Sequence, residues 1–197
     1  LKCDIRKFFA SIDQGIINDI VCRYIPDERI RALIAEVVGS FRSKILQSDC
    51  CIRGLPLGNL TSQLLVNVYM NEFDQFVKHK LKARYYIRYA DDFVILSDSK
   101  TCLEELLPRI EHYLRMRLNL NLHPDKVSIA TFASGIDFLG WVHFPDHRVL
   151  RTSAKRRMFR NLIDNASDAK VASYRGLLKH GNARKLGALL QKMNLYV

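Results

Sequence analysis

Two adjacent carboxylates are the first residues whose placement suggests chemistry. Asp91 and Asp92 lie between runs of β-branched and aromatic residues in YIRYADDFVIL, residues 86–96. Such flanks predict two strands joined by a tight turn. Two-residue hairpin turns favour Asn-Gly or Asp-Gly because they need positive φ angles. This turn has no glycine, so we expect backbone strain, which gathers at working sites. The alternative is an ordinary solvated turn, since aspartate is common in turns.

A third carboxylate, Asp4, ends a strand predicted over residues 1–6. If that strand pairs beside the hairpin, Asp4, Asp91 and Asp92 converge on one edge. Three such carboxylates repel one another unless cations neutralise them. Hard oxygen ligands favour Mg²⁺ or Mn²⁺ over zinc, and two such ions about 3.5–4 Å apart clamp phosphoryl displacements. The alternative for Asp4 is a simple strand-end cap.

Hydrophobic periodicity predicts the elements that position these residues. We expect helices over 12–24 and 27–41, the second with Asp27 as its N-cap and an apolar face that includes Leu33 and Val37. A loop over 42–58 precedes a helix over 60–81, in which Leu64 is an apolar position, and a capping box of Thr101 and Glu104 opens a helix to 118. Short strands near 126–131, 135–143 and 148–150 precede a basic helical tail. This order lacks regular βαβ alternation and predicts an α+β fold.

Composition points to a polyanionic partner. The 197 residues carry a net charge of +11, and 48% are hydrophobic, which allows a real core. Nucleic acid is the commonest partner for such a charge, and an acidic membrane surface is less common. Five basic residues and no acid lie in 151–160, which predicts salt-sensitive contacts with a nucleic-acid backbone, the alternative being a solvated helix face. The predicted contact residues are Lys155, Arg156, Arg157 and Arg160.

The cysteines and termini give weaker indications. Five cysteines without a CxxC pair favour neither zinc nor a disulfide framework and indicate a reduced, cytosolic protein. No apolar run is long enough to span a membrane, and no signal peptide is visible. The sequence opens on Leu1 rather than Met, so we expect a fragment or an unrecorded start.

Five blocks in a fixed order give the chain a family resemblance. They read LKCDIRKFFASID, GLPLGNLTSQLLVNVYMNEFD, YADD, LHPDKV and FLGW. In this order they resemble the palm of a reverse transcriptase, closely over residues 1–145. The resemblance implies a right-hand palm over 1–149, an antiparallel sheet packed on helices, followed by a helical partial thumb over 150–197. The family's fingers should precede Asp4 and are missing here, so the isolated fragment is expected to be weak or inactive.

The resemblance also implies roles for the catalytic residues. Asp4, Asp91 and Asp92 become the ligands of two Mg²⁺ ions, for which Mn²⁺ can substitute. Phe9 falls where the family places a steric gate under the sugar, which would clash with a ribose 2′-hydroxyl, whereas Phe8 is assigned to the core. Lys126 matches a lysine that could protonate the pyrophosphate leaving group, with a solvated lysine as the alternative.

Two further blocks imply contacts with substrates. Gly54, Pro56 and Gly58 permit a tight loop near a ligand, and Asn59 or Thr61 could cap the helix that follows. The nucleotide-binding positions of this block are Leu57, Gly58, Asn59 and Gln63. FLGW resembles the primer grip, with strand packing and a core Trp141 as the alternative; its residues are Phe138, Leu139, Gly140 and Trp141.

Finer features resemble one branch of the family. LPLGNLTSQ and the later SYRGLLKHGN resemble the reverse transcriptases of diversity-generating retroelements, which are bacterial or phage-encoded. That resemblance implies error-prone copying of template RNA into cDNA from dNTPs and a primer, in the cytoplasm, with a small basic accessory protein as partner. Alternatives are a group II intron-like, retron or phage-defence reverse transcriptase, an RNA polymerase of similar palm, which Phe9 disfavours, and a catalytically inactive RNA-binding module.

Overall fold

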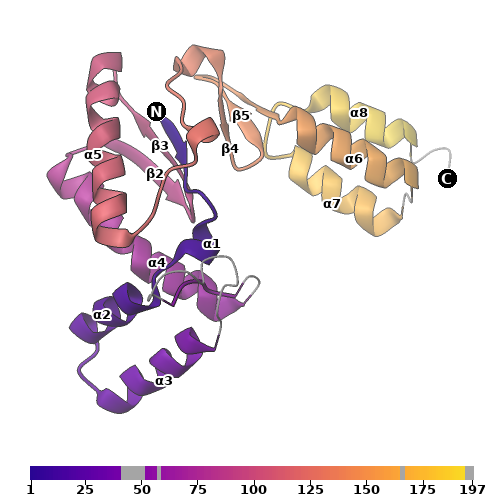
Figure 1. Ribbon diagram of the computed structural model, residues 1–197. Coiled ribbons are helices and arrows are strands. Elements are labelled where there is room, and N and C mark those ends of the chain that lie inside the picture. Colours follow the sequence, from indigo (N-terminus) through magenta and orange to yellow (C-terminus); the bar gives the residue numbers. More distant parts are fainter. Residues whose placement is uncertain (41–51, 57–58, 165–166, 194–197) are drawn as a thin grey trace. The chain divides into compact units, whose positions relative to one another are not determined.

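The computed structural model describes residues 1–40, 52–56, 59–164 and 167–193, and it confirms the α+β class (Figure 1). The chain forms two compact units, Leu1–Ile129 and Ala130–Val197. This division falls earlier than the palm–thumb boundary predicted after residue 149, because residues 130–149 belong to the second unit. Calling residues 1–149 a palm and 150–197 a thumb therefore stays a prediction.

The first unit is built on a three-stranded antiparallel sheet. Its strands are β1 (Lys2–Asp4), β2 (Tyr85–Tyr89) and β3 (Asp92–Leu96), in the order β1-β3-β2. The predicted hairpin is thus present, and the first strand pairs beside it. Cross-strand pairs place Cys3 opposite Phe93 and Asp4 opposite Asp92. Because side chains alternate along a strand, Cys3 and Phe93 point to one face and the two aspartates to the other.

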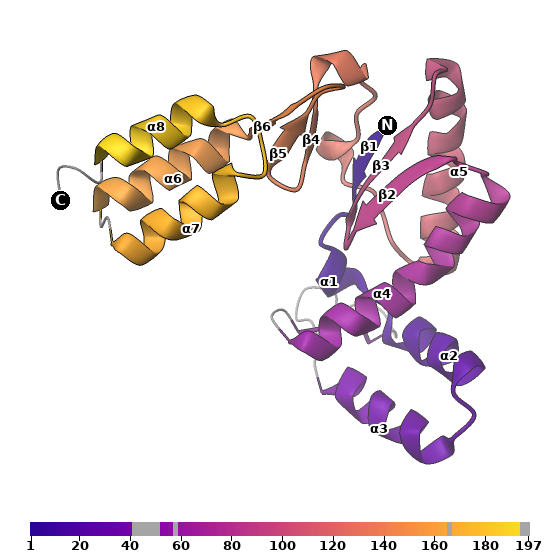
Figure 2. The same ribbon diagram turned by 180° about the vertical axis from the view of Figure 1, so that it is seen from behind.

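Two helices cover the face of the sheet that carries Phe93. They are α4 (Leu60–Gln75), which continues as a π-helix over Phe76–Lys80, and α5 (Lys100–Leu118). The unit also contains α1 (Phe8–Ser11), α2 (Gln14–Tyr24) and α3 (Glu28–Gly39), of which α2 contacts both α3 and α4. Phe73 of α4 makes edge-to-face contacts with Phe93 at 5.1 Å and with Tyr86 at 6.2 Å between ring centroids. These contacts place α4 against the inner face of the sheet, as the two opposite views show (Figures 1 and 2).

Several predicted details differ in the structure. Asp27 is the N-cap of α3, as predicted, and accepts hydrogen bonds from two backbone N–H groups. The cap of α5 is Ser99 rather than Thr101, because its hydroxyl accepts from the Cys102 N–H. Leu64, an apolar position of the predicted helix, is exposed, as are most of the apolar residues on the face of α3; these are Ile30, Leu33 and Val37.

The strand predicted near 126–131 is not formed. Pro124 opens a 3₁₀ turn, Pro124–Lys126, because its fixed φ and missing N–H favour a turn over a ladder. Beyond it, Ser128 makes a single bridge to Lys2 of β1. This turn nevertheless brings Lys126 to the end of β1, where Asp4 lies.

The second unit combines a small sheet with three helices. Strands β4 (Ile136–Phe138), β5 (Trp141–His143) and β6 (Arg148–Leu150) form an antiparallel meander. Helices α6 (Thr152–Asp164), α7 (Asp168–Leu178) and α8 (Arg184–Met193) follow. Their common core contains Trp141, Leu150, Met158, Leu162, Val171, Leu178, Ala183 and Leu190.

Candidate active site

The three aspartates meet at one edge of the first sheet. Asp4 and Asp92 are direct cross-strand partners at the ends of β1 and β3. Asp91 precedes β3 in the turn, and its carbonyl accepts a hydrogen bond of 3.2 Å from the N–H of Ile5. The backbone therefore brings together the three carboxylates that the sequence predicted to converge.

The turn that carries Asp91 has a strained backbone. Ala90 has a φ of 52°, in the left-handed region that residues other than glycine seldom adopt. For a residue with a β-carbon, this conformation costs about 1–2 kcal/mol. The strain expected from the missing glycine is therefore present, and surrounding contacts must hold the turn.

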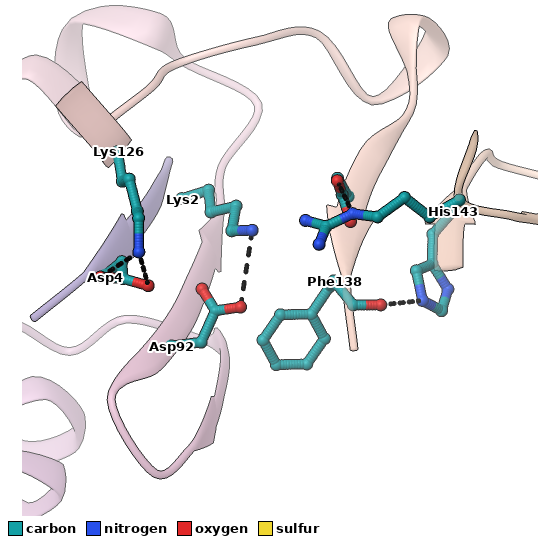
Figure 3. Close-up of polar contacts among 8 residues, drawn as sticks. Lys2, Asp4, Asp92, Lys126, Phe138 and His143 are labelled. Carbon is teal, nitrogen blue, oxygen red and sulfur yellow. Dashed lines mark hydrogen bonds and ion pairs between the residues drawn. The ribbon is translucent and has the colours of Figure 1, made fainter. Parts of the chain in front are cut away.

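Two lysines form ion pairs with two of these carboxylates (Figure 3). Lys126 Nζ lies 3.1 Å from both carboxylate oxygens of Asp4. Lys2 Nζ lies 3.5 Å from Asp92 Oδ2. Across the described residues, no group of three His, Cys, Asp or Glu side chains is close enough to hold a metal ion. Asp4 and Asp92 are thus each paired with an ammonium group, and the neutralisation that the repelling carboxylates require comes here from lysine side chains.

The electrostatics of the turn work against ionisation of its carboxyls. Burial raises the pKa of Asp91, and the nearby Asp4 adds to the rise while Lys126 opposes it. Burial likewise raises the pKa of Asp92, against the opposing effect of Lys2, and Asp4 and Asp91 raise it further. Additional positive charge at this edge would therefore stabilise the ionised forms.

The donor set fits a hard divalent cation. Asp92 Oδ1 is buried and accepts no hydrogen bond from the described residues, which is an uncommon state for a carboxylate oxygen. A cation would satisfy that oxygen, and carboxylates from β1 and β3 are the ligands that Mg²⁺ and Mn²⁺ prefer. Asp4, Asp91 and Asp92 thus remain the predicted metal ligands.

The structure describes some, but not all, of the residues predicted to contact the nucleotide. Phe8 is buried as predicted, and Phe9 is half-buried with its ring edge-to-face to that of Phe8, 5.5 Å away. Asn59 is the N-cap of α4, but its side chain makes no capping bond, and Gln63 is exposed. Leu57 and Gly58 lie outside the described residues. A nucleotide role for Phe9, Asn59 and Gln63 stays a prediction.

The FLGW block forms the β4–β5 hairpin. Leu139 and Gly140 are its two turn residues, with φ angles of 53° and 82°, and Phe138 pairs with Trp141 across it. Nε2 of His143 lies 3.3 Å from the Phe138 carbonyl oxygen (Figure 3). Trp141 belongs to the core of the second unit, so the packing alternative describes it correctly. Leu139 is 51% exposed, and a primer-grip role for this hairpin stays a prediction.

Leu139 gives a test of strain against function. We expect Leu139→Asn to raise the free energy of unfolding by about 1 kcal/mol, because asparagine tolerates a positive φ better than leucine does. If the hairpin grips a primer, the same change weakens primer extension. Leu139→Ala is the control, since it removes the leucine side chain without supplying the short polar side chain that hydrogen-bonds locally in this conformation. Chemical denaturation and primer extension measure the two effects, and equal stability of the two variants would contradict the strain argument.

The four predicted basic contacts lie on α6. Arg156, Arg157 and Arg160 are exposed, and Lys155 is half-buried. None of the four forms an ion pair within the described part of the chain. Their charges are therefore available to an anionic partner, and binding to a nucleic-acid backbone stays a prediction.

Two polar features of the site were not predicted from the sequence. Lys2 faces Asp92 because it lies two residues before Asp4 on the same face of β1, a spacing that the sequence shows. Asp74 of α4 binds Arg88 of β2 with Oδ2 2.7 Å from the guanidinium. No local pattern in the sequence identifies this partner of Arg88, which is fourteen residues away.

An antiparallel sheet backed by helices, with carboxylates at a hairpin turn, is the palm-like arrangement of a polymerase. The family model "Reverse transcriptase (RNA-dependent DNA polymerase)" matches residues 1–143. The chain therefore belongs to the reverse transcriptase family.

The chain is also similar to a curated bacterial protein. Protein YkfC of Escherichia coli (strain K12) is 26% identical over 227 residues, and the match covers 99% of this chain and 56% of that protein. The chain thus spans about half the length of this relative. Among the described helices, none has the length and apolar character needed to cross a membrane.

Proposed function

We propose that the full-length protein is an RNA-directed DNA polymerase that extends a primer with dNTPs. The observation that carries this proposal is the pairing of Asp4 with Asp92 beside the strained turn of Asp91. Asp4, Asp91 and Asp92 would hold two divalent cations, Mg²⁺ or Mn²⁺, which activate the primer hydroxyl and neutralise the departing pyrophosphate.

Lys126 would act as the proton donor at this edge. Its ammonium group contacts both oxygens of Asp4, and its side chain is 54% exposed, so it can reach a ligand from solvent. A lysine there can transfer a proton from Nζ to the leaving pyrophosphate, a general-acid role. In the absence of substrate, the same ammonium group neutralises Asp4.

Phe9 supplies a test of sugar selection. We expect Phe9→Val to increase the use of rNTPs relative to dNTPs at least tenfold, because a steric contact of this size is worth about 1–3 kcal/mol. Phe9→Tyr preserves the bulk of the ring and is the matched control. Single-nucleotide incorporation with each substrate measures the ratio of kcat/KM values. Unchanged discrimination in Phe9→Val would remove Phe9 from the nucleotide site.

We assign the finer biology to the diversity-generating group. The support is the second block, LPLGNLTSQ, and the late SYRGLLKHGN, together with the bacterial origin of the relative YkfC. Error-prone cDNA synthesis on a template RNA, a small basic accessory protein and a cytoplasmic location follow from that assignment. The basic face of α6 would hold nucleic-acid backbone through salt-sensitive contacts.

Primer extension tests the proposal. Full-length protein is incubated with an RNA template, a DNA primer, dNTPs and Mg²⁺, with and without the accessory protein, beside an Asp91→Asn, Asp92→Asn variant. Extension that the variant lacks supports the polymerase, and errors concentrated at template adenines support the diversity-generating type. Accurate products favour an intron-like or retron-like enzyme. RNA binding without extension would leave an RNA-binding module.

A further inference from the structure

A buried ion pair lies directly behind the catalytic turn. Arg88 and Asp74 have side chains only 8% and 21% exposed. The guanidinium of Arg88 donates from Nε to Asp74 Oδ1 at 2.8 Å and from a terminal nitrogen to Oδ2 at 2.7 Å. Such a planar, two-point contact fixes orientation as well as charge. Asp74 is carried by α4, so the contact ties β2 to that helix.

A second residue of β2, Tyr86, also holds Asp74 in place. The hydroxyl of Tyr86 donates to Asp74 Oδ1 at 2.6 Å. Burial alone would raise the pKa of Asp74, but the hydrogen bonds from Arg88 and Tyr86 outweigh it, and the pKa lies below its ordinary value. Asp74 therefore stays ionised and keeps the guanidinium in one orientation.

The third nitrogen of the guanidinium reaches the turn itself. It donates at 3.1 Å to the carbonyl oxygen of Ala90, the residue with the left-handed φ of 52°. A strained residue persists only where its surroundings hold it. Among the described residues, Arg88 provides the side-chain hydrogen bond to this peptide group, and the next two residues along the chain are Asp91 and Asp92.

We propose that Arg88 is a positioning residue. Asp74 holds its guanidinium in one orientation, and the guanidinium holds the Ala90 carbonyl. As a result, Asp91 and Asp92 face Asp4. This inference rests on the proposed function, since it concerns the same three carboxylates. A purely structural ion pair would stabilise the fold but would not affect the affinity of the sheet edge for a cation. A positioning role for Arg88 means that this affinity depends on the pair.

The substitution Arg88→Lys separates these two roles. Arg88→Lys keeps a positive charge beside Asp74, but one ammonium group cannot reproduce a planar fork together with a third bond to Ala90. Tyr113→Phe is the matched control: the Tyr113 hydroxyl donates to the Glu72 carbonyl at 3.0 Å, so this change also removes a hydrogen bond to α4, but it touches no residue of the turn.

The experiment measures cation binding apart from catalysis. Mn²⁺ is titrated calorimetrically into full-length protein without nucleic acid, with the Asp91→Asn, Asp92→Asn variant as the baseline for the site. We expect Arg88→Lys to weaken Mn²⁺ binding about tenfold and to raise the Mg²⁺ concentration for half-maximal extension by a similar factor, with Tyr113→Phe within twofold of the wild type. If Arg88→Lys does not fold, Asp74→Asn replaces it and should act in the same direction.

The outcomes separate the inference from the function on which it rests. Wild-type Mn²⁺ affinity in Arg88→Lys, equal weakening in Tyr113→Phe, or no Mn²⁺ binding by the wild type would each overturn the positioning role. A protein that binds Mn²⁺ as expected but never extends a primer would instead overturn the polymerase, and the titration would still support Arg88.

Discussion

Replacing Asp91 and Asp92 together by asparagine is expected to abolish primer extension and, at the same time, to raise the melting temperature. Extension should fall at least about a thousandfold, because the cations proposed to bind here would supply several kcal/mol of stabilisation in the transition state. Stability should rise because burial disfavours the two ionised carboxyls and raises their pKa values. Asparagine has nearly the same shape and carries no charge to desolvate.

The raised pKa values determine how the stability difference between the wild type and the variant changes with pH. A carboxyl whose pKa is higher in the folded than in the unfolded state binds more protons when folded. The free energy of unfolding therefore falls as pH rises from the unfolded value, about 3.9, through the raised folded value, and the penalty is complete above it. The wild type should thus lose stability relative to the variant across this window.

Thermal unfolding measured from pH 3 to 8, with and without Mg²⁺, tests both effects. Mg²⁺ should raise the melting temperature of the wild type, because a ligand that binds the folded state stabilises it, and it should leave that of the variant unchanged. Asp98→Asn, a change of an exposed aspartate in the loop after β3, is the control. A variant less stable than the wild type at neutral pH would show that these carboxylates support the fold.

Gly181→Ala is expected to destabilise the second unit by about 1–3 kcal/mol or more. A β-carbon at this position would lie 2.1 Å from Cζ3 of Trp141 and 2.8 Å from two further ring atoms. Trp141 is fixed in the core, and the guanidinium of Arg148 lies 5.4 Å from the centre of its ring. The ring cannot turn away without disrupting that core, and overpacking of this kind is destabilising.

Gly176→Ala is the matched control. Gly176 lies in α7, and an added β-carbon there would have no neighbour within 4 Å. Alanine in a helix is more stable than glycine by about 0.5–1 kcal/mol, so this variant should gain stability. Trp141 is the only tryptophan of the chain, so its fluorescence during chemical denaturation reports on this unit. Equal midpoints for the two variants would contradict the predicted clash.

The features that sequence predicted well depend on local patterns. The β2–β3 hairpin follows from alternating strand residues around a short polar turn, and the cap of α3 follows from an aspartate before an apolar run. The convergence of Asp4 with Asp92 was conditional on strand pairing, and the register supplied it.

The features that were missed depend on tertiary contacts or on near-equal local choices. Ser99 and Thr101 are both good caps, so only the observed hydrogen bond decides between them. The exposure of Leu64 and the partnership of Asp74 with Arg88 depend on what packs beside α4, which helical periodicity does not reveal. The lysine pairs at Asp4 and Asp92 arise from strand pairing and from a turn that Pro124 initiates.

Cys3 precedes Asp4 in β1 but points to the opposite face, where it is fully buried. Burial raises the pKa of its thiol to about 12, so at neutral pH it carries a proton and neither competes for soft metals nor reacts with oxidants. A thiol reagent can reach it only when β1 leaves the sheet. The rate at which Cys3 becomes modified therefore measures how often the strand that bears Asp4 detaches from its neighbour.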